Sequence, residues 1–180
     1  MCGIVGYIGE KQAAPILLDG LSKLEYRGYD SAGIAVRDGA NEAEVVKAKG
    51  RLSILSDKID AGNALKGTCG IGHTRWATHG VPSTVNAHPH CDENEKIAVV
   101  HNGIIENYLE IREQLISEGH VFKSETDTEV IPHLIQKFMD EGFDLEHAVR
   151  KTIGIIEGAY AIAAISVNEP DKIVATRKDS

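Results

Sequence analysis

The chain carries a cysteine, Cys2, directly after its initiator methionine. If an aminopeptidase removes Met1, which the small side chain at position 2 favours, Cys2 holds a thiol and a free α-amine on one carbon. The thiolate is the nucleophilic form of cysteine, and an amine with a pKa of about 8 can accept the thiol proton near neutral pH. The first nine residues, MCGIVGYIG, therefore predict a nucleophile with its own base. The alternative is that Cys2 is one more apolar residue of a first strand.

Asn102 and Gly103 are of the right types to assist such a nucleophile. Attack of a thiolate on a carboxamide builds a tetrahedral oxyanion, which needs preorganised hydrogen-bond donors. A side-chain amide beside a glycine whose N–H can be approached closely provides a plausible pair. The alternative is a tight Asn-Gly turn, which is less natural here because the following residues predict a helix and not a second strand.

Arg75 and Asp127 could hold the two charged ends of a free amino acid. Arginine binds a carboxylate through two parallel hydrogen bonds, and aspartate pairs with an ammonium group. A surface ion pair would also account for Arg75. The helix dipole would also account for Asp127 in a first helical turn, although that position is compatible with binding.

A zinc site is a further alternative, because six potential ligands occur between residues 73 and 101. They are His73, His79, His88, His90, Cys91 and His101. Against zinc, the chain has no Cys-x-x-Cys pair, Pro89 separates two of the histidines, and helical ligand spacing is missing. We therefore predict no metal and no organic cofactor.

Composition limits the class of protein. The chain has 180 residues, 42% of them hydrophobic and 26% charged, which suits one globular domain. Its net charge of −8 argues against nucleic acid or an anionic membrane as a partner. It shows neither a signal segment nor an apolar run long enough to cross a bilayer, so we expect a cytoplasmic protein. Three cysteines without a spacing pattern fit free thiols in a reducing compartment.

Apolar patterning predicts both helices and antiparallel strands. The predicted strands cover residues 3–8, 31–36, 43–50, 69–75, 96–103, 159–167 and 172–177. The predicted helices cover residues 51–59, 105–118, 127–141 and 144–153, and an earlier helix has Pro15 in its first turn and ends near residues 26–28. Four details are added to this pattern. We expect strand 3–8 to be buried, an apolar face on helix 105–118 formed by Ile105, Leu109, Leu115 and Ile116, a capping box from Thr126 to Glu129, and a hairpin turn through residues 168–171.

Five motifs give the chain a family resemblance. They are EYRGYDSAG at 25–33, GHTRWATHG at 72–80, NAHPH at 86–90, HNGIIENY at 101–108 and SETDTE at 124–129. In that order they resemble the class II glutamine amidotransferase domain, of the N-terminal-nucleophile (Ntn) hydrolase type, over nearly the whole chain. Within the class, the first two are more similar to the branch that aminates fructose 6-phosphate than to the amidophosphoribosyltransferases or asparagine synthetases.

The resemblance implies an α+β fold, a four-layer αββα sandwich of two mostly antiparallel sheets. It implies that residues 1–180 form this domain, incomplete at its C-terminal end, and that the sugar-phosphate isomerase domains are absent from the chain. The implied substrate is L-glutamine, hydrolysed to glutamate and ammonia through a cysteine thioester. The ammonia would normally pass to the isomerase part to make glucosamine 6-phosphate. An inactive or binding-only fragment and an amidophosphoribosyltransferase-type glutaminase remain as alternatives.

The resemblance also assigns roles to individual residues. The implied catalytic residues are Cys2, Asn102, Gly103, Arg27 and Gly28, the last two orienting the cysteine and its amine. The implied substrate-binding residues are Arg75, Trp76, Thr78, His79 and Asp127. Trp76 lies in a loop that resembles a lid, whose expected purpose is to exclude water.

Overall fold

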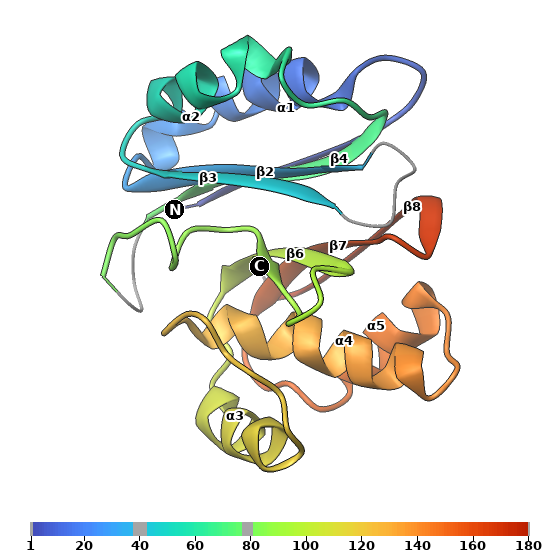
Figure 1. Ribbon diagram of the computed structural model, residues 1–180. Helices are drawn as coiled ribbons and strands as arrows, with labels where there is room; N and C mark the ends of the chain where they lie inside the picture. Colours follow the sequence, from blue (N-terminus) through green and yellow to red (C-terminus); the bar gives the residue numbers. More distant parts are fainter. Residues whose placement is uncertain (1, 38–42, 77–80, 180) are drawn as a thin grey trace.

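The computed structural model describes residues 2–37, 43–76 and 81–179, without the side chain of Arg27. Two antiparallel sheets lie face to face, and each is covered on its outer side by helices (Figure 1). This arrangement confirms the predicted α+β fold and its four αββα layers. Among the described residues, no helix combines the length and the apolar character needed to cross a bilayer.

The first sheet has the strand order β1-β4-β2-β3. Its strands are β1 (Gly3–Ile8), β2 (Ser31–Arg37), β3 (Glu44–Lys49) and β4 (Cys69–Arg75). Helices α1 (Ala13–Ser22) and α2 (Leu52–Lys58) cover its outer face, with the short 3-10 helices η1 (Glu25–Arg27) and η2 (Asp60–Gly62) at their ends. Pro15 is tolerated in α1 because it lies in the first turn, where its missing N–H has no helical partner to lose. Leu17, Leu21 and Leu55 are fully buried against this sheet.

The second sheet has the strand order β5-β6-β7-β8. Its strands are β5 (His90–Cys91), β6 (Ile97–Gly103), β7 (Tyr160–Ser166) and β8 (Glu169–Lys178). Helices α4 (Val130–Asp140) and α5 (Leu145–Ile153) cover its outer face, and α3 (Tyr108–Ser117) packs against α4 farther from the sheet. The 3-10 helix η3 (Asp127–Glu129) leads directly into α4. The largest apolar cluster lies between this sheet and these helices and includes Ile131, Ile135 and Ile162.

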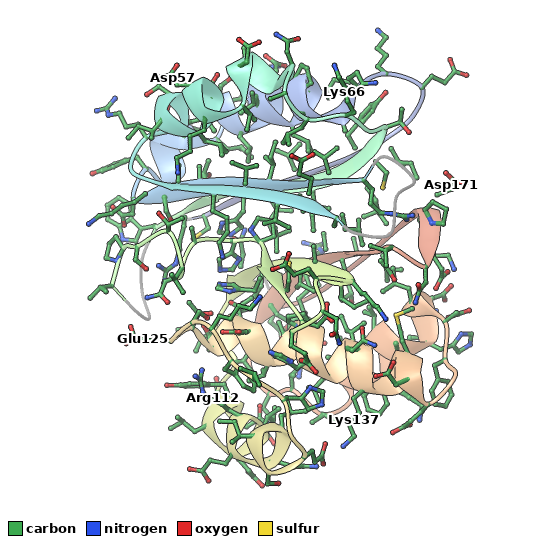
Figure 2. The ribbon with its side chains drawn as sticks, in the orientation of Figure 1. Asp57, Lys66, Arg112, Glu125, Lys137 and Asp171 are labelled. Carbon is green, nitrogen blue, oxygen red and sulfur yellow. The ribbon has the colours of Figure 1, made fainter. Side chains whose placement is uncertain are left out.

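Side chains fill the space between the two sheets (Figure 2). The middle of this interface is apolar and contains Ala35, Ile71 and Val100. At one end, the buried guanidinium of Arg37 donates hydrogen bonds across the interface to the carbonyl oxygens of Ser166 and Val167, at 2.6 and 2.7 Å. The opposite end carries Cys2, because Gly3 pairs with Thr74 near the last residue of β4.

Strand β1 is less buried than predicted. Only Gly3 of its six residues is buried, and Ile8 is 46% exposed. The reason is that β1 lies at an edge of its sheet within the described part of the chain. The backbone N–H of Trp76, directly after β4, and the side chain of Asn102 in β6 contact Cys2 instead.

Helix α3 begins three residues later than predicted, at Tyr108. The amides of Ile105 and Glu106 are engaged elsewhere, because they donate to the carboxylate of Asp127 and to the carbonyl of Glu157. The predicted apolar face is half right. Ile105 and Leu115 are buried as expected, whereas Leu109 and Ile116 are 59% and 51% exposed, and Ile111 completes the buried face.

The predicted capping box is wrong as well. The carboxylate of Glu129 accepts the N–H groups of Lys123 and Ser124 instead of that of Thr126, whose side chain caps nothing. The predicted turn through 168–171 is shorter, since Val167 and Asn168 form it and Glu169 already pairs with Ser166. Pro170 is accommodated inside β8 because β8 is an edge strand of the described sheet.

Candidate active site

Cys2 lies where the ends of the two sheets meet. Its side chain is partly buried, and its sulfur accepts a hydrogen bond from the backbone N–H of Trp76 at 3.2 Å. This donor follows β4 directly, so the antiparallel pairing of β1 with β4 determines where the sulfur lies.

Asn102, the next-to-last residue of β6, contacts Cys2 from the other sheet. Its Nδ2 donates to the carbonyl oxygen of Cys2 at 3.1 Å, and its Oδ1 lies 2.8 Å from Nε2 of His73. The chemistry of these partners fixes the orientation of the amide, since a carbonyl can only accept. The N–H₂ group of Asn102 therefore faces the nucleophile, as an oxyanion donor requires.

His73 holds that amide in place. Its Nε2 faces two acceptors, Oδ1 of Asn102 and the carbonyl oxygen of His101 at 3.1 Å, so Nε2 must carry the proton. Burial lowers the pKa of His73 to about 4 against the opposing effect of these two contacts, and Arg75 lowers it further. His73 is thus a neutral donor at physiological pH.

A ring of hydrogen bonds lies behind His73. The His88 side chain stacks on that of His73 with the ring centroids 4.1 Å apart. The backbone N–H of His101 donates to Nδ1 of His88 at 3.2 Å, so the proton of neutral His88 is on Nε2, which lies 3.5 Å from the hydroxyl of Thr128. That hydroxyl lies 2.9 Å from Nδ1 of His101 and can donate to it. Burial holds the pKa of His88 well below its usual value and lowers that of His101 to about 3.

Gly103 ends β6 in a conformation that only glycine adopts readily. Its φ is +124°, and an added Cβ would lie 2.0 Å from the carbonyl oxygen of Ala159. Asn102 and Gly103 pair with Ala161 and Tyr160 of β7, so they are the last residues of a strand. The tight-turn alternative for this dipeptide is therefore wrong.

Arg75 and Asp127 lie close to Cys2 and to each other. Both are buried, at 4% and 6% exposure. Burial lowers the pKa of Arg75, whereas the nearby charges of Cys2, Asp127 and Asp30 raise it. Asp127 is in the first turn of η3, as its helix-dipole interpretation requires, and its Oδ2 accepts the N–H of Ile105 at 2.8 Å. The structure thus brings a guanidinium and a carboxylate together beside the thiol.

Trp76 and Gly28 lie at the end of β4. Trp76 is 45% exposed and lies edge-on to Tyr29, with the ring centroids 5.6 Å apart. Gly28 is the extended residue after η1, and an added Cβ would lie 2.8 to 3.0 Å from the peptide that joins Arg75 to Trp76. Close approach, and not a left-handed helix end, is the reason for glycine there. Thr78, His79 and the side chain of Arg27 lie outside the described residues.

A cavity of about 520 Å³ opens beside Cys2 and Asn102, between the sheets. Parts of β1, β7 and β8 form its other walls, and neither Arg75 nor Asp127 lines it. Sequence reasoning missed His73 as a supporting residue and considered it only as a possible zinc ligand. Strand alternation could have identified it, because residues 73 and 75 lie on the same face of a strand.

Comparison with known proteins is consistent with this arrangement. A family model described as a glutamine amidotransferase domain matches residues 73–179. The chain is 59% identical to a glutamine–fructose-6-phosphate aminotransferase (isomerizing) of Clostridium tetani and 56% identical to that of Methanothermobacter thermautotrophicus. Each match covers 100% of this chain but only 29% and 30% of the relative, so the chain spans under a third of their length.

Solved structures show the same fold. A glutamine phosphoribosylpyrophosphate amidotransferase from B. subtilis, complexed with ADP and GMP, superposes with a TM-score of 0.78 at 29% identity. The match covers 93% of this chain and 35% of that one.

Proposed function

Because the chain belongs to the glutamine amidotransferase domain family, we propose that it hydrolyses the side-chain amide of L-glutamine with Cys2 as the nucleophile. One observation carries this proposal. Asn102, oriented by His73, directs its N–H₂ group at Cys2 from the opposite sheet. A preorganised donor beside a thiol is what acyl transfer through a tetrahedral intermediate needs.

The proposed reaction uses the N-terminal amine that removal of Met1 would expose. This amine takes the thiol proton of Cys2, and the sulfur attacks the carboxamide carbon of glutamine. The N–H₂ group of Asn102 and the N–H of Gly103 stabilise the resulting oxyanion. The amine then returns the proton to the departing nitrogen, the C–N bond breaks, and ammonia leaves. Water cleaves the glutamyl thioester to give glutamate and the free thiol.

In this proposal the charged ends of glutamine bind to Arg75 and Asp127. The guanidinium takes the α-carboxylate and the carboxylate takes the α-ammonium, and both groups are almost completely buried. Trp76, Thr78 and His79 would close over the substrate. Arg27 and Gly28 would orient the terminal amine and Cys2, and Gly28 already packs against the peptide whose N–H contacts the sulfur.

The fate of the ammonia is proposed from the relatives alone. By their printed names, the curated relatives are isomerizing glutamine–fructose-6-phosphate aminotransferases. We propose that residues 1–180 are the glutaminase domain of such an enzyme, acting with a sugar-phosphate isomerase domain in a cytoplasmic, reducing setting. The 59% identity favours this acceptor over the amidophosphoribosyl acceptor, whose solved relative is 29% identical.

The decisive experiment is intact mass spectrometry with a glutamine-shaped electrophile such as a diazoketone analogue. We expect loss of Met1 and one adduct per chain, and no adduct in Cys2→Ala. Cys91→Ser is the matched control, because burial raises the pKa of that thiol to about 12 and keeps it protonated. Retention of Met1, or labelling that does not depend on Cys2, would contradict the proposal. A glutaminase assay on the processed protein then measures turnover.

A further inference from the structure

A second group of histidines lies in the outer helical layer of the second sheet, away from Cys2. Glu93 belongs to the connection between β5 and β6, His120 follows α3, and His133 is in α4. The helices α3 and α4, marked by the labelled side chains of Arg112 and Lys137, pack together in this layer (Figure 2). The ligating atoms of Glu93, His120 and His133 all lie within 4.8 Å of one another.

The two imidazoles converge on one carboxylate. Nδ1 of His133 lies 2.7 Å from Oε2 of Glu93, and Nδ1 of His120 lies 3.2 Å from both oxygens of the same group. The rings are 5.2 Å apart and steeply inclined at 72°, so their nitrogens approach the carboxylate from different directions. In this arrangement two nitrogen ligands and one oxygen ligand can surround a single metal ion.

His133 also has the outer partner that metal-bound histidines have. Its Nε2 lies 3.8 Å from Oε1 of Glu129, whose carboxylate is fixed by the N–H groups of Lys123 and Ser124 at 2.7 and 2.6 Å. A carboxylate behind a histidine fixes its tautomer and increases its basicity toward a metal. His133 is fully buried, and within the described parts of the chain neither of its nitrogens makes a hydrogen bond of acceptable geometry. Its polar atoms are therefore unsatisfied.

The placement of the carboxylates suits a cation. Oε2 of Glu93 lies 2.7 Å from Nδ1 of His133, and Oε1 of Glu129 lies 3.8 Å from its Nε2. Two carboxylates thus flank one buried imidazole.

We propose that Glu93, His120 and His133 bind a divalent transition-metal ion, with zinc as the best match to these ligands. Two histidines and one glutamate with an open fourth position form a known zinc ligand set. The site is accessible, since the side chains of Glu93 and His120 are 29% and 13% exposed. The ion would connect a strand turn, a loop and α4. This site is separate from the proposed glutaminase chemistry and does not depend on it.

The test is competition for zinc between the untagged protein and a chromophoric chelator. We would use a Cys2→Ser background, because a terminal thiol and amine bind zinc themselves. One ion per chain is expected, and Glu93→Gln or His120→Gln should each weaken binding by about 100-fold or more. His147→Gln is the matched control. That histidine also contacts a carboxylate, Asp144 at 2.8 Å, but the pair is exposed and lacks a third ligand.

Cobalt provides a second readout. Co²⁺ should give the intense visible absorption of a four-coordinate site, which is lost in both variants and kept in His147→Gln. Far-UV circular dichroism shows whether each variant is folded; both replaced side chains reach solvent, so we expect native spectra. Equal zinc affinity in parent and variants, or a cobalt spectrum that neither substitution changes, would overturn the proposal and leave an ion-pair cluster only.

Discussion

The two ends of the β-sandwich are both crossed by polar side chains, but with different groups. At one end, the Arg37 cation donates to two backbone carbonyls of the opposite sheet. At the other end a chain of neutral groups crosses, with His73 donating to Asn102 and Asn102 donating to the carbonyl of Cys2, beside the charged Arg75 and Asp127. The Arg37 cation uses its donors on the protein's own carbonyls and so joins the sheets. A neutral amide can exchange a carbonyl acceptor for a developing oxyanion, which is the role proposed for Asn102.

The largest effect expected at the reacting end comes from Asn102→Ala. Loss of this oxyanion donor should lower kcat for glutamine hydrolysis by about 10²- to 10³-fold, roughly 3 to 4 kcal/mol of barrier. Asn107→Ala is the matched control, because Asn107 also makes two amide hydrogen bonds, to Ile155 and Glu157, but lies outside the site. Steady-state assays of both variants measure kcat. Equal kcat values in Asn102→Ala and Asn107→Ala would show that Asn102 does not act as an oxyanion donor.

The next effect is expected at the opposite end, in Arg37→Met. The substitution leaves the carbonyls of Ser166 and Val167 without their buried donor, which should cost about 2 to 3 kcal/mol of unfolding free energy. Activity per folded molecule should stay the same, because Arg37 is at the far end of the sandwich from Cys2. Urea unfolding measures this loss of unfolding free energy. Arg150→Met is the matched control: Arg150 forms an exposed ion pair with Glu146, so its substitution should lower the unfolding free energy by less than about 0.5 kcal/mol.

A smaller effect is expected from His73→Phe, which removes the group that orients Asn102. We expect kcat to fall by about 10- to 100-fold with little change in KM, since part of the oxyanion stabilisation of roughly 3 to 4 kcal/mol is lost. His73→Gln keeps an N–H₂ donor and should recover part of the rate. If the two variants lost stability but kept a normal kcat, His73 would have only a packing role.

The smallest effect, counted for each pH unit, is expected in the pH dependence of stability. The pKa of His73 is about 4 in the folded protein, below its ordinary value of 6.5. Between these pH values the unfolded state binds more protons, so stability falls as the pH drops from 6.5 and levels off below 4. The slope is about 1.4 kcal/mol per pH unit for each such histidine. We would measure unfolding free energy by urea unfolding at several pH values. Its slope against pH should be shallower in His73→Phe by the contribution of one histidine. Equal slopes would mean that His73 is not held neutral.

Sequence alone identified the groups that stand at strand ends. Cys2, Asn102 and Arg75 each adjoin a short apolar run, and polar residues that follow buried strands commonly face a shared edge. Apolar patterning also predicted the strands, whereas the four layers were predicted from the family resemblance. These are local signals, and the structure brings the three residues together as expected.

The features that sequence reasoning missed depend on partners far along the chain. His73 acquires its role from Asn102, which belongs to the other sheet. The later start of α3 depends on Asp127, which captures the amide of Ile105. Glu129 is a local exception, because its carboxylate accepts the N–H groups of Lys123 and Ser124, six and five residues earlier, and not that of Thr126. Helix and strand periodicity carry no information about such tertiary contacts.

The hydrogen-bond ring of His88, Thr128 and His101 has a direction. It begins at a backbone N–H, which can only donate, so Nδ1 of His88 accepts and the proton of that ring is on Nε2. The donor, the N–H of His101, belongs to a buried residue of β6. Its hydrogen can therefore exchange with solvent only when His88 moves away from β6. The exchange rate of this one amide would report how often the strand that carries Asn102 loses its cover.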